Sequence, residues 1–276
     1  MLDSNKNIHY VEKEGVPFLR FPILEKYPVI HGFSTRLGGV SKGDCTSMNL
    51  SFTRGDRRED VEENHRLFAN AVGYDIETLV LTEQVHDTKI RRVGKGDTGE
   101  VFCERRSIRE TDGLITDEPG VMLMTFFADC VPLLFYDPVR RAVGNAHSGW
   151  RGTVQRMGQK MTGKMKEEFG SQPENLLVVI GPSIGQCCYE VSEEVISEFQ
   201  KVFDQKYLDD IYYKKPDGHY QLNLWQANKI LLMQAGVKEE HICVSEVCTC
   251  CHPDLLFSHR YTHGKRGNLS AVIGLA

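Results

Sequence analysis

One stretch of the sequence, residues 121–152 (VMLMTFFADCVPLLFYDPVRRAVGNAHSGWRG), constrains the fold most strongly. It opens with an uninterrupted apolar run over 121–127, which predicts a buried strand. Two further apolar segments, 133–136 and 142–146, flank the sequence Asp137-Pro138-Val139-Arg140. Asp followed by Pro favours a type I turn. The stretch therefore predicts a buried strand that leads into a β-hairpin.

The hairpin turn also predicts how two reactive side chains are placed. If Asp137 and Arg140 flank the turn, Cys130 lies opposite His147 on the paired strand. The Cβ atoms of directly opposed residues are about 4.5–5.5 Å apart. A thiolate and an imidazole at that separation can bind one metal ion together, or they can act as a nucleophile and its base.

The rest of the chain predicts a mixed α/β fold. Residues 1–30 are typical of an N-terminal hairpin or a pair of edge strands, and Thr111-Asp112-Gly113 is typical of a turn. Helical periodicity covers 60–72, 152–169, 193–202 and 224–235, whereas 79–82, 176–180, 241–245 and 269–273 are typical of strands and 206–220 of a charged connection. With no low-complexity linker, we predict one α/β domain spanning residues 1–276, with mixed rather than wholly parallel sheets.

Composition narrows the classes of function. Over 276 residues, 41% hydrophobic and 26% charged residues are ordinary for a soluble globular protein. A net charge of −5 gives no reason to expect nucleic acid or an anionic membrane as a partner. No apolar run approaches the ~20 residues that cross a bilayer, and the polar N-terminal segment is unlike a secretory signal. Nine cysteines, an odd number, favour free thiols and a cytoplasmic location.

His86, Cys130 and His147 all lie at predicted strand ends beside polar loops. Two imidazoles and one thiolate suit zinc, and three protein ligands with an open fourth position are typical of a catalytic zinc site. The spacing between them matches no short zinc motif. From the residues alone, the alternative that these histidines are ordinary polar residues and that Cys130 fills space stays open.

Two other cysteine groups and one glycine-rich loop are also candidates. We expect Cys248–His252 and Cys187–Cys188 to be loops of reduced thiols, because adjacent cysteines rarely share a tetrahedral ion. The loop at 31–43 (HGFSTRLGGVSKG) contains Arg36 and ends near Asn49. Its backbone N–H groups and Arg36 can surround an anion such as phosphate, although such loops are also common as simple turns.

Several motifs in order resemble one known family. These are HGFSTRLGGVSKG, EQVH, ADCVPLLFYDP, AVGNAHSGWRGT, GPSIGQCCYEV and LLFSHR, which extend from about residue 30 to the C-terminus. They resemble the YfiH-like proteins, which have been called laccase-domain or polyphenol-oxidase-like proteins, purine nucleoside phosphorylases and peptidoglycan-editing factors. The ending FSHRYTHGKRGNLS departs from the FSYRRDG-type segment common in the family, so no role is assigned to Arg260 or to residues 261–268.

The resemblance implies both a fold and an activity. It implies a layered α/β/β/α arrangement with mixed sheets, and zinc ligands at His86, Cys130 and His147. It also implies phosphorolysis of purine nucleosides such as adenosine or inosine to a free base and ribose 1-phosphate, with adenosine deamination as a related activity. The small-molecule partners are then a nucleoside and phosphate, and Arg36 and Asn49 are the candidate substrate contacts.

Three alternatives remain. In the first, Cys130 is a nucleophile activated by His147 in a metal-free amide hydrolase or deamidase that acts in peptidoglycan editing. In the second, the protein is a copper phenol oxidase, against which ten scattered histidines without H-x-H pairs argue. In the third, it is a binding module with no catalytic activity. Metal content and nucleoside turnover separate these alternatives.

Overall fold

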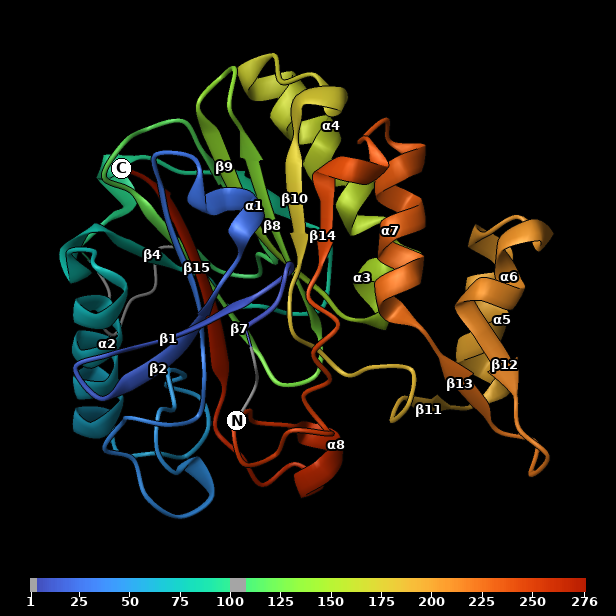
Figure 1. Cartoon of the computed structure of the whole chain (residues 1–276), viewed down its shortest axis with the longest axis horizontal. Coiled ribbons are helices and arrows are strands. Elements are labelled where there is room, and N and C mark those ends of the chain that lie inside the picture. The colour runs from blue at the N-terminus through green and yellow to red at the C-terminus, as the bar shows by residue number, and fades with distance from the viewer. Residues whose placement is uncertain (1–3, 100–107) are drawn as a thin grey trace.

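The computed structural model describes residues 4–99 and 108–276 as two six-stranded sheets, a smaller third sheet and surrounding helices (Figure 1). The first sheet contains, in spatial order, β1 (His9–Lys13), β2 (Val16–Arg20), β3 (Val29–Ser34), β15 (Leu269–Leu275), β7 (Met122–Phe127) and β4 (Leu79–Leu81). The second contains β14 (Ile242–Val244), β10 (Leu177–Ile180), β8 (Val131–Asp137), β9 (Ala142–Ser148), β6 (Gly113–Thr116) and β5 (Ile90–Arg92). Parallel and antiparallel neighbours occur in both, which confirms the predicted α/β class with mixed sheets.

The described residues form the helices α1 (Pro22–Glu25), α2 (Arg58–Val72), α3 (Trp150–Val154), α4 (Met157–Phe169), α5 (Glu193–Val202), α6 (Gln205–Ile211), α7 (Leu224–Gln234) and α8 (His259–Thr262). Helix α2 covers the outer face of the first large sheet, and α3, α4 and α7 cover that of the second, whereas α5 and α6 lie beside the third sheet (Figure 1). Within the described ranges, no helix combines the length and the apolar composition needed to span a bilayer.

Three apolar clusters account for this layering. Leu123 and Ile273 of the first sheet share a core with Leu134 and Val179 of the second, so the two sheets pack face to face. On the far side of the first sheet, α2 packs against β2, β7 and β15. On the far side of the second sheet, α4 and α7 form another core. The order is therefore helix, sheet, sheet, helix, as the sequence resemblance implied.

The predicted hairpin exists, but its register differs from the prediction. Asp137 pairs with Ala142, and Pro132, not Cys130, pairs with His147. The loop is longer than a tight turn, because Asp137 Oδ1 accepts the N–H groups of both Val139 and Arg140, at 2.8 and 3.1 Å. A shift of two residues keeps every side chain on its predicted face. Cys130 therefore still lies on the same side of the hairpin as His147.

Two other predictions need correction. The helix expected over 152–169 is interrupted at Arg156, whose left-handed backbone (φ 64°) separates α3 from α4. The segment 206–220, expected to be a charged connection, contains α6 and the strands β12 (Tyr212–Lys214) and β13 (Tyr220–Leu222), which pair with β11 (Glu190–Val191) in the third sheet. Leu208 and Ile211, one helical turn apart, are buried and stabilise α6.

Candidate metal centre and substrate pocket

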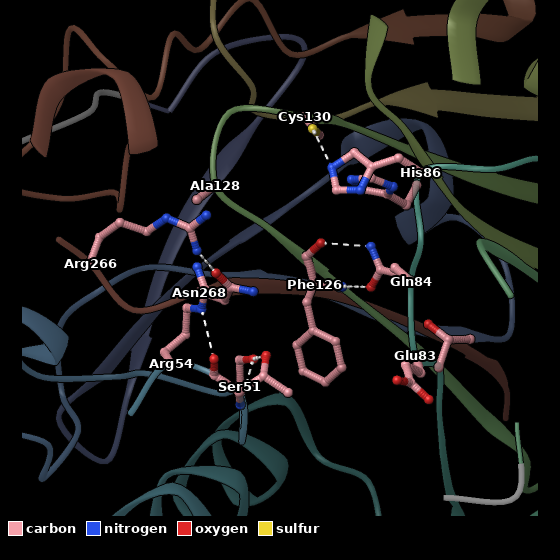
Figure 2. Close-up of a pocket in the computed structure, with 13 residues that line it drawn as sticks. Ser51, Arg54, Glu83, Gln84, His86, Phe126, Ala128, Cys130, Arg266 and Asn268 are labelled. Atoms are coloured by element: carbon pink, nitrogen blue, oxygen red, sulfur yellow. Dashed lines mark hydrogen bonds between the residues drawn. The ribbon is translucent and has the colours of Figure 1, made fainter. Parts of the chain in front are cut away.

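His86, Cys130 and His147 meet at the junction of the two large sheets. His86 follows β4 of the first sheet, Cys130 lies between β7 of the first and β8 of the second, and His147 lies in β9. One side-chain ligand atom from each residue lies within 4.8 Å of the other two. Cys130 Sγ is 3.9 Å from His86 Nε2 (Figure 2). The three residues that the sequence analysis singled out are thus brought together.

The Asp112 side chain forms hydrogen bonds with both histidine residues of this centre. Its carboxylate is buried and accepts the N–H groups of Val85, His86 and Asp87, at 2.9, 3.1 and 3.2 Å. Its Oδ1 is also 2.8 Å from Nδ1 of His147. This contact fixes the ring so that Nε2 of His147 is the nitrogen left to bind a metal. One carboxylate therefore positions both histidines.

The ionisation of the centre follows from these contacts. Burial alone raises the pKa of the Cys130 thiol, but the charge and hydrogen bond of His147, together with His86, lower it to about 6. Burial likewise lowers the pKa of His147, but the Cys130 thiolate and Asp112 raise it to about 9. Without a metal, the two groups form a thiolate–imidazolium pair over the intervening pH range. The thiolate is also the form of Cys130 that binds a metal.

Local backbone geometry makes room for the ligands. His86 and Asp129 have positive φ angles, 63° and 85°, which non-glycine residues adopt infrequently. Gly149, next to the end of β9, faces Cys130. A Cβ atom at Gly149 would lie 2.9 Å from Cys130 Sγ, so a glycine is needed where the sulfur approaches the backbone.

A cavity of about 270 Å³ opens beside the three ligands. Its wall is formed by Ser51, Thr53, Arg54, Thr82, Glu83, Gln84, His86, Phe126, Ala128, Cys130, His147, Arg266 and Asn268. Figure 2 shows His86 and Cys130 at one end, and Arg54 and Arg266 on the opposite side. Gln84 fixes the wall between them, since its amide forms two hydrogen bonds with the backbone of Phe126, at 2.9 and 2.7 Å.

Two arginines make one side of this cavity strongly basic. Within residues 4–99 and 108–276, no carboxylate forms an ion pair with either Arg54 or Arg266. Burial and the neighbouring charge of Arg54 lower the pKa of Arg266 to about 10. Arg266 donates hydrogen bonds to Asn268 Oδ1 and, at 3.3 Å, to the carbonyl oxygen of Gly267. An anion bound here would relieve the repulsion between the two guanidinium groups.

Arg36 and Asn49 do not line this cavity. The Arg36 guanidinium donates to the carbonyl oxygens of Thr46 and Pro253, at 2.8–3.0 Å, and stacks over Phe257. Asn49 is fully buried and bonds to Ser51, Asp56 and Asn268. The N–H groups of the glycine-rich loop are used in the same way: those of Leu37, Gly39, Val40 and Ser41 bond to Thr35, Ser47 and Asn64. The polar groups of this loop are thus used within the protein, and the structure does not show the phosphate cradle that the sequence predicts.

The donor set of the centre fits a divalent metal of borderline softness. Two imidazole nitrogens and one thiolate are typical zinc ligands. Three protein ligands would leave the fourth position open towards the cavity, which is the arrangement of a catalytic site and not of a closed structural site. Asp112 supplies the carboxylate–histidine contact that often accompanies such ligands.

Sequence reasoning missed Asp112, Arg54 and Arg266. Asp112 lies in a segment typical of a turn, and nothing in the sequence shows that its carboxylate faces inward. Arg54 and Arg266 are more than 200 residues apart in loops of mixed charge. The available signal was that both loops contain arginine and glycine, which is common in ordinary turns.

Known proteins resemble this chain over most of its length. The family profile described as "Multi-copper polyphenol oxidoreductase laccase" matches residues 30–276. The chain is 38% identical over 248 residues to the protein named Purine nucleoside phosphorylase YlmD from Bacillus subtilis, which covers 90% of this chain and 88% of that protein.

Solved structures agree with this match. The crystal structure of the hypothetical protein YfiH from Bacillus licheniformis has a TM-score of 0.91 at 35% identity, covering 97% of this chain and 99% of that one. YlmD from Geobacillus stearothermophilus has a TM-score of 0.90 at 36% identity, covering 96% and 98%. The chain therefore belongs to the YfiH-like family, described as multi-copper polyphenol oxidoreductase laccase proteins.

Proposed function

We propose that this protein is a zinc-dependent purine nucleoside phosphorylase that uses inorganic phosphate to release the base from adenosine or inosine. The observation that carries the proposal is the pocket itself, in which a His–Cys–His centre faces two arginines that have no carboxylate partner among the described residues. The relatives that are named purine nucleoside phosphorylase support the same reaction.

In this proposal, Arg54 and Arg266 bind the attacking phosphate. Guanidinium groups form charge-assisted, often paired hydrogen bonds with phosphate oxygens. Ser51, Thr53 and Asn268 also line the cavity and offer further polar groups to phosphate or to the ribose hydroxyls. The nucleoside then occupies the space between the arginines and the His–Cys–His centre.

The reaction moves electrons from the arginine side towards the metal side. A phosphate oxygen forms a bond to C1′ of the ribose, while the C1′–N9 bond breaks and its electron pair passes to the purine. The purine must then gain a proton. Among the described residues that line the cavity, Glu83 carries the single carboxyl group, and we assign the proton transfer to it. When bound, zinc supplies positive charge and Lewis acidity at the end of the pocket where negative charge develops.

Adenosine deamination is the second reaction that we propose for this pocket. It replaces the C6 amino group by oxygen from water and releases ammonia, so it needs an activated water and an acid–base group near the purine. His86, Cys130 and His147 would hold the metal that meets the first requirement, and Glu83 can carry protons for the second. Phosphate is not consumed, so the two reactions are separable in one assay.

The test is a chromatographic assay of adenosine and inosine with and without phosphate, using wild-type protein and the variants Arg54→Gln and Arg266→Gln. Loss of one charge-assisted bond of ~1.5–3 kcal/mol should raise the KM for phosphate roughly 10–100-fold and leave the KM for nucleoside within about threefold. The control is Arg57→Gln, an exposed arginine that pairs with Glu59 outside the cavity. No phosphate-dependent base release from zinc-loaded protein would refute the proposal.

A second candidate is a metal-free Cys–His amide hydrolase. The observation that favours it is the line Asp112–His147–Cys130, in which a buried carboxylate orients an imidazole beside a thiol whose pKa is lowered to about 6. This candidate predicts that metal-stripped protein cleaves amide substrates, including those of peptidoglycan, and that zinc inhibits it. The phosphorylase proposal predicts that stripping zinc abolishes turnover and that adding zinc restores it. Copper would be tested in the same reconstitution, and we expect no phenol oxidation.

A further inference from the structure

A second group of sulfur atoms lies outside the pocket. Cys187 and Cys188 follow β10, whereas Cys248 and Cys251 follow β14, its parallel neighbour. The two segments continue side by side beyond the sheet, with a bridge between Ser183 and Cys248. The two cysteine pairs are about 60 residues apart in the sequence, and the structure brings them together with all four sulfur atoms within 4.8 Å of one another.

We propose that Cys187, Cys188, Cys248 and Cys251 bind a second zinc ion, with a structural role. With zinc–sulfur bonds of ~2.3 Å, the sulfur atoms of a tetrahedral site are about 3.8 Å apart. Cys251 Sγ is 3.5 Å from Cys187 Sγ and 3.4 Å from Cys188 Sγ, close to that separation. Because Cys251 contacts two sulfurs almost equally, the group is arranged for a shared ion and not for one pairwise bond.

The surroundings of the sulfurs fit a metal-bound thiolate. Cys248 and Cys251 have the C-x2-C spacing that zinc sites commonly use. The backbone N–H of Gly185 donates to Cys248 Sγ at 3.2 Å, a contact that stabilises a negatively charged sulfur. A Cβ at Gly185 would lie 3.2 Å from the Cβ of Cys248 and 3.0 Å from Trp225, so the backbone can approach only as glycine.

Binding releases protons and leaves a net charge of −2 on the four thiolates and zinc. Arg260 offsets this charge, because its guanidinium donates to the carbonyl oxygens of Cys188 and Glu190, at 3.0 and 2.8 Å. Four protein ligands leave no open position, which is the arrangement of a structural site. The ion would therefore fasten two loops to each other and take no part in the reaction.

These two loops hold the backbone beside the catalytic centre. Thr249, between two of the ligands, donates its hydroxyl to Asp129 Oδ1 at 2.6 Å. Ile184 N–H donates to the carbonyl oxygen of Asp129 at 2.9 Å, and Arg260 N–H donates to its Oδ2 at 2.7 Å. Asp129 has the positive φ of 85° and directly precedes Cys130. The second zinc would thus keep Cys130 in place.

The first test is zinc content under reducing conditions. We expect two zinc ions per chain in wild-type protein, one in Cys130→Ser and one in Cys251→Ser. Cys250→Ser is the matched control, because Cys250 lies in the same loop but outside the four-sulfur group, and it should keep two. One zinc in wild-type protein, lost on Cys130→Ser, would overturn the proposal.

Cobalt substitution and alkylation test the ligands without relying on turnover. Thiolate-to-cobalt absorption per ion should be about four times stronger in Cys130→Ser, which keeps the four-sulfur site, than in the His–Cys–His centre of Cys251→Ser. In folded wild-type protein, iodoacetamide should modify the exposed Cys187 and Cys251 only after a chelator removes zinc. Modification at equal rates with and without zinc, or a disulfide in zinc-replete protein, would exclude the site whatever the enzyme's activity.

Discussion

The Asp112→Asn variant tests how much of the candidate metal centre depends on one buried carboxylate. Asp112 accepts four hydrogen bonds, two on each oxygen: Oδ1 from His86 N–H and His147 Nδ1, and Oδ2 from Val85 and Asp87 N–H. Asparagine has nearly the same shape but only one acceptor oxygen. If its NH2 group replaces Oδ2, the bonds from Val85 and Asp87 N–H are lost. If it replaces Oδ1, the bond from His86 N–H is lost, and the bond to His147 is kept only in the tautomer whose Nδ1 carries no proton.

The magnitude follows from these contacts. A hydrogen bond to a charged group is worth ~1.5–3 kcal/mol, so one or two lost bonds correspond to roughly 1.5–6 kcal/mol of unfolding free energy. The backbone donors are only part-buried and can recover some hydration, so we expect about 3 kcal/mol. Zinc affinity should fall a further ~10–100-fold, because an amide beside His147 favours the tautomer whose Nε2 carries the proton and cannot bind metal.

The assay is urea unfolding of chelator-treated protein, which removes the contribution of metal binding to stability, together with a zinc competition titration. The control is Asp137→Asn. Asp137 is also buried, but both N–H groups that it accepts contact one oxygen, so asparagine can keep them. If Asp112→Asn loses less than about 1 kcal/mol and binds zinc within about threefold of wild type, Asp112 does not organise the centre as described.

Two further predictions concern the same centre. Gly149→Ala should destabilise the protein by ~1–3 kcal/mol or displace Cys130 and weaken zinc binding, because the new Cβ would lie 2.9 Å from Cys130 Sγ. Urea unfolding and metal titration measure these effects. The control is Gly163→Ala in α4, which has open space around it and should be neutral or stabilising by up to ~1 kcal/mol. In metal-free protein, the rate of Cys130 alkylation should rise as pH increases through about 6, not near the ordinary thiol value of 9.0, and a profile centred near 9 would contradict the thiolate–imidazolium pair. The pH dependence of the unfolding free energy would not reveal this pair. Between pH values of about 6.5 and 9, folding releases a proton from Cys130, which makes stability rise with pH, and binds a proton at His147, which makes stability fall with pH. The two effects cancel.

The sequence predicts which residues form the centre better than it predicts the register of the strands that hold them. Cys130 and His147 were placed on paired strands because an apolar run, a turn and a second apolar run are local signals. The register was wrong by two residues, because the side chain of Asp137 supports a longer loop than the Asp-Pro pair alone predicts. The even shift preserved the face, which is why Cys130 and His147 still meet.

Contacts between residues that are far apart in the sequence could not be predicted from local patterns. Arg54 lies near Arg266, and Cys187 near Cys251, because of the order of the strands in the sheets. Strand order is decided by packing of the whole core, and no local pattern reports it. Arg36 illustrates the converse: its loop has the composition of an anion site, yet its guanidinium is used by two backbone carbonyls.

The position of the pocket at the junction of the two large sheets has a consequence for how the protein is assembled. His86 depends on the first sheet, His147 on the second, and Arg266 and Asn268 on the segment that enters β15. A folding intermediate with only one sheet formed cannot present a complete set of ligands or the basic wall. Metal capture and phosphate binding should therefore be late events in refolding, and the rate at which zinc becomes tightly held would report the docking of the two sheets.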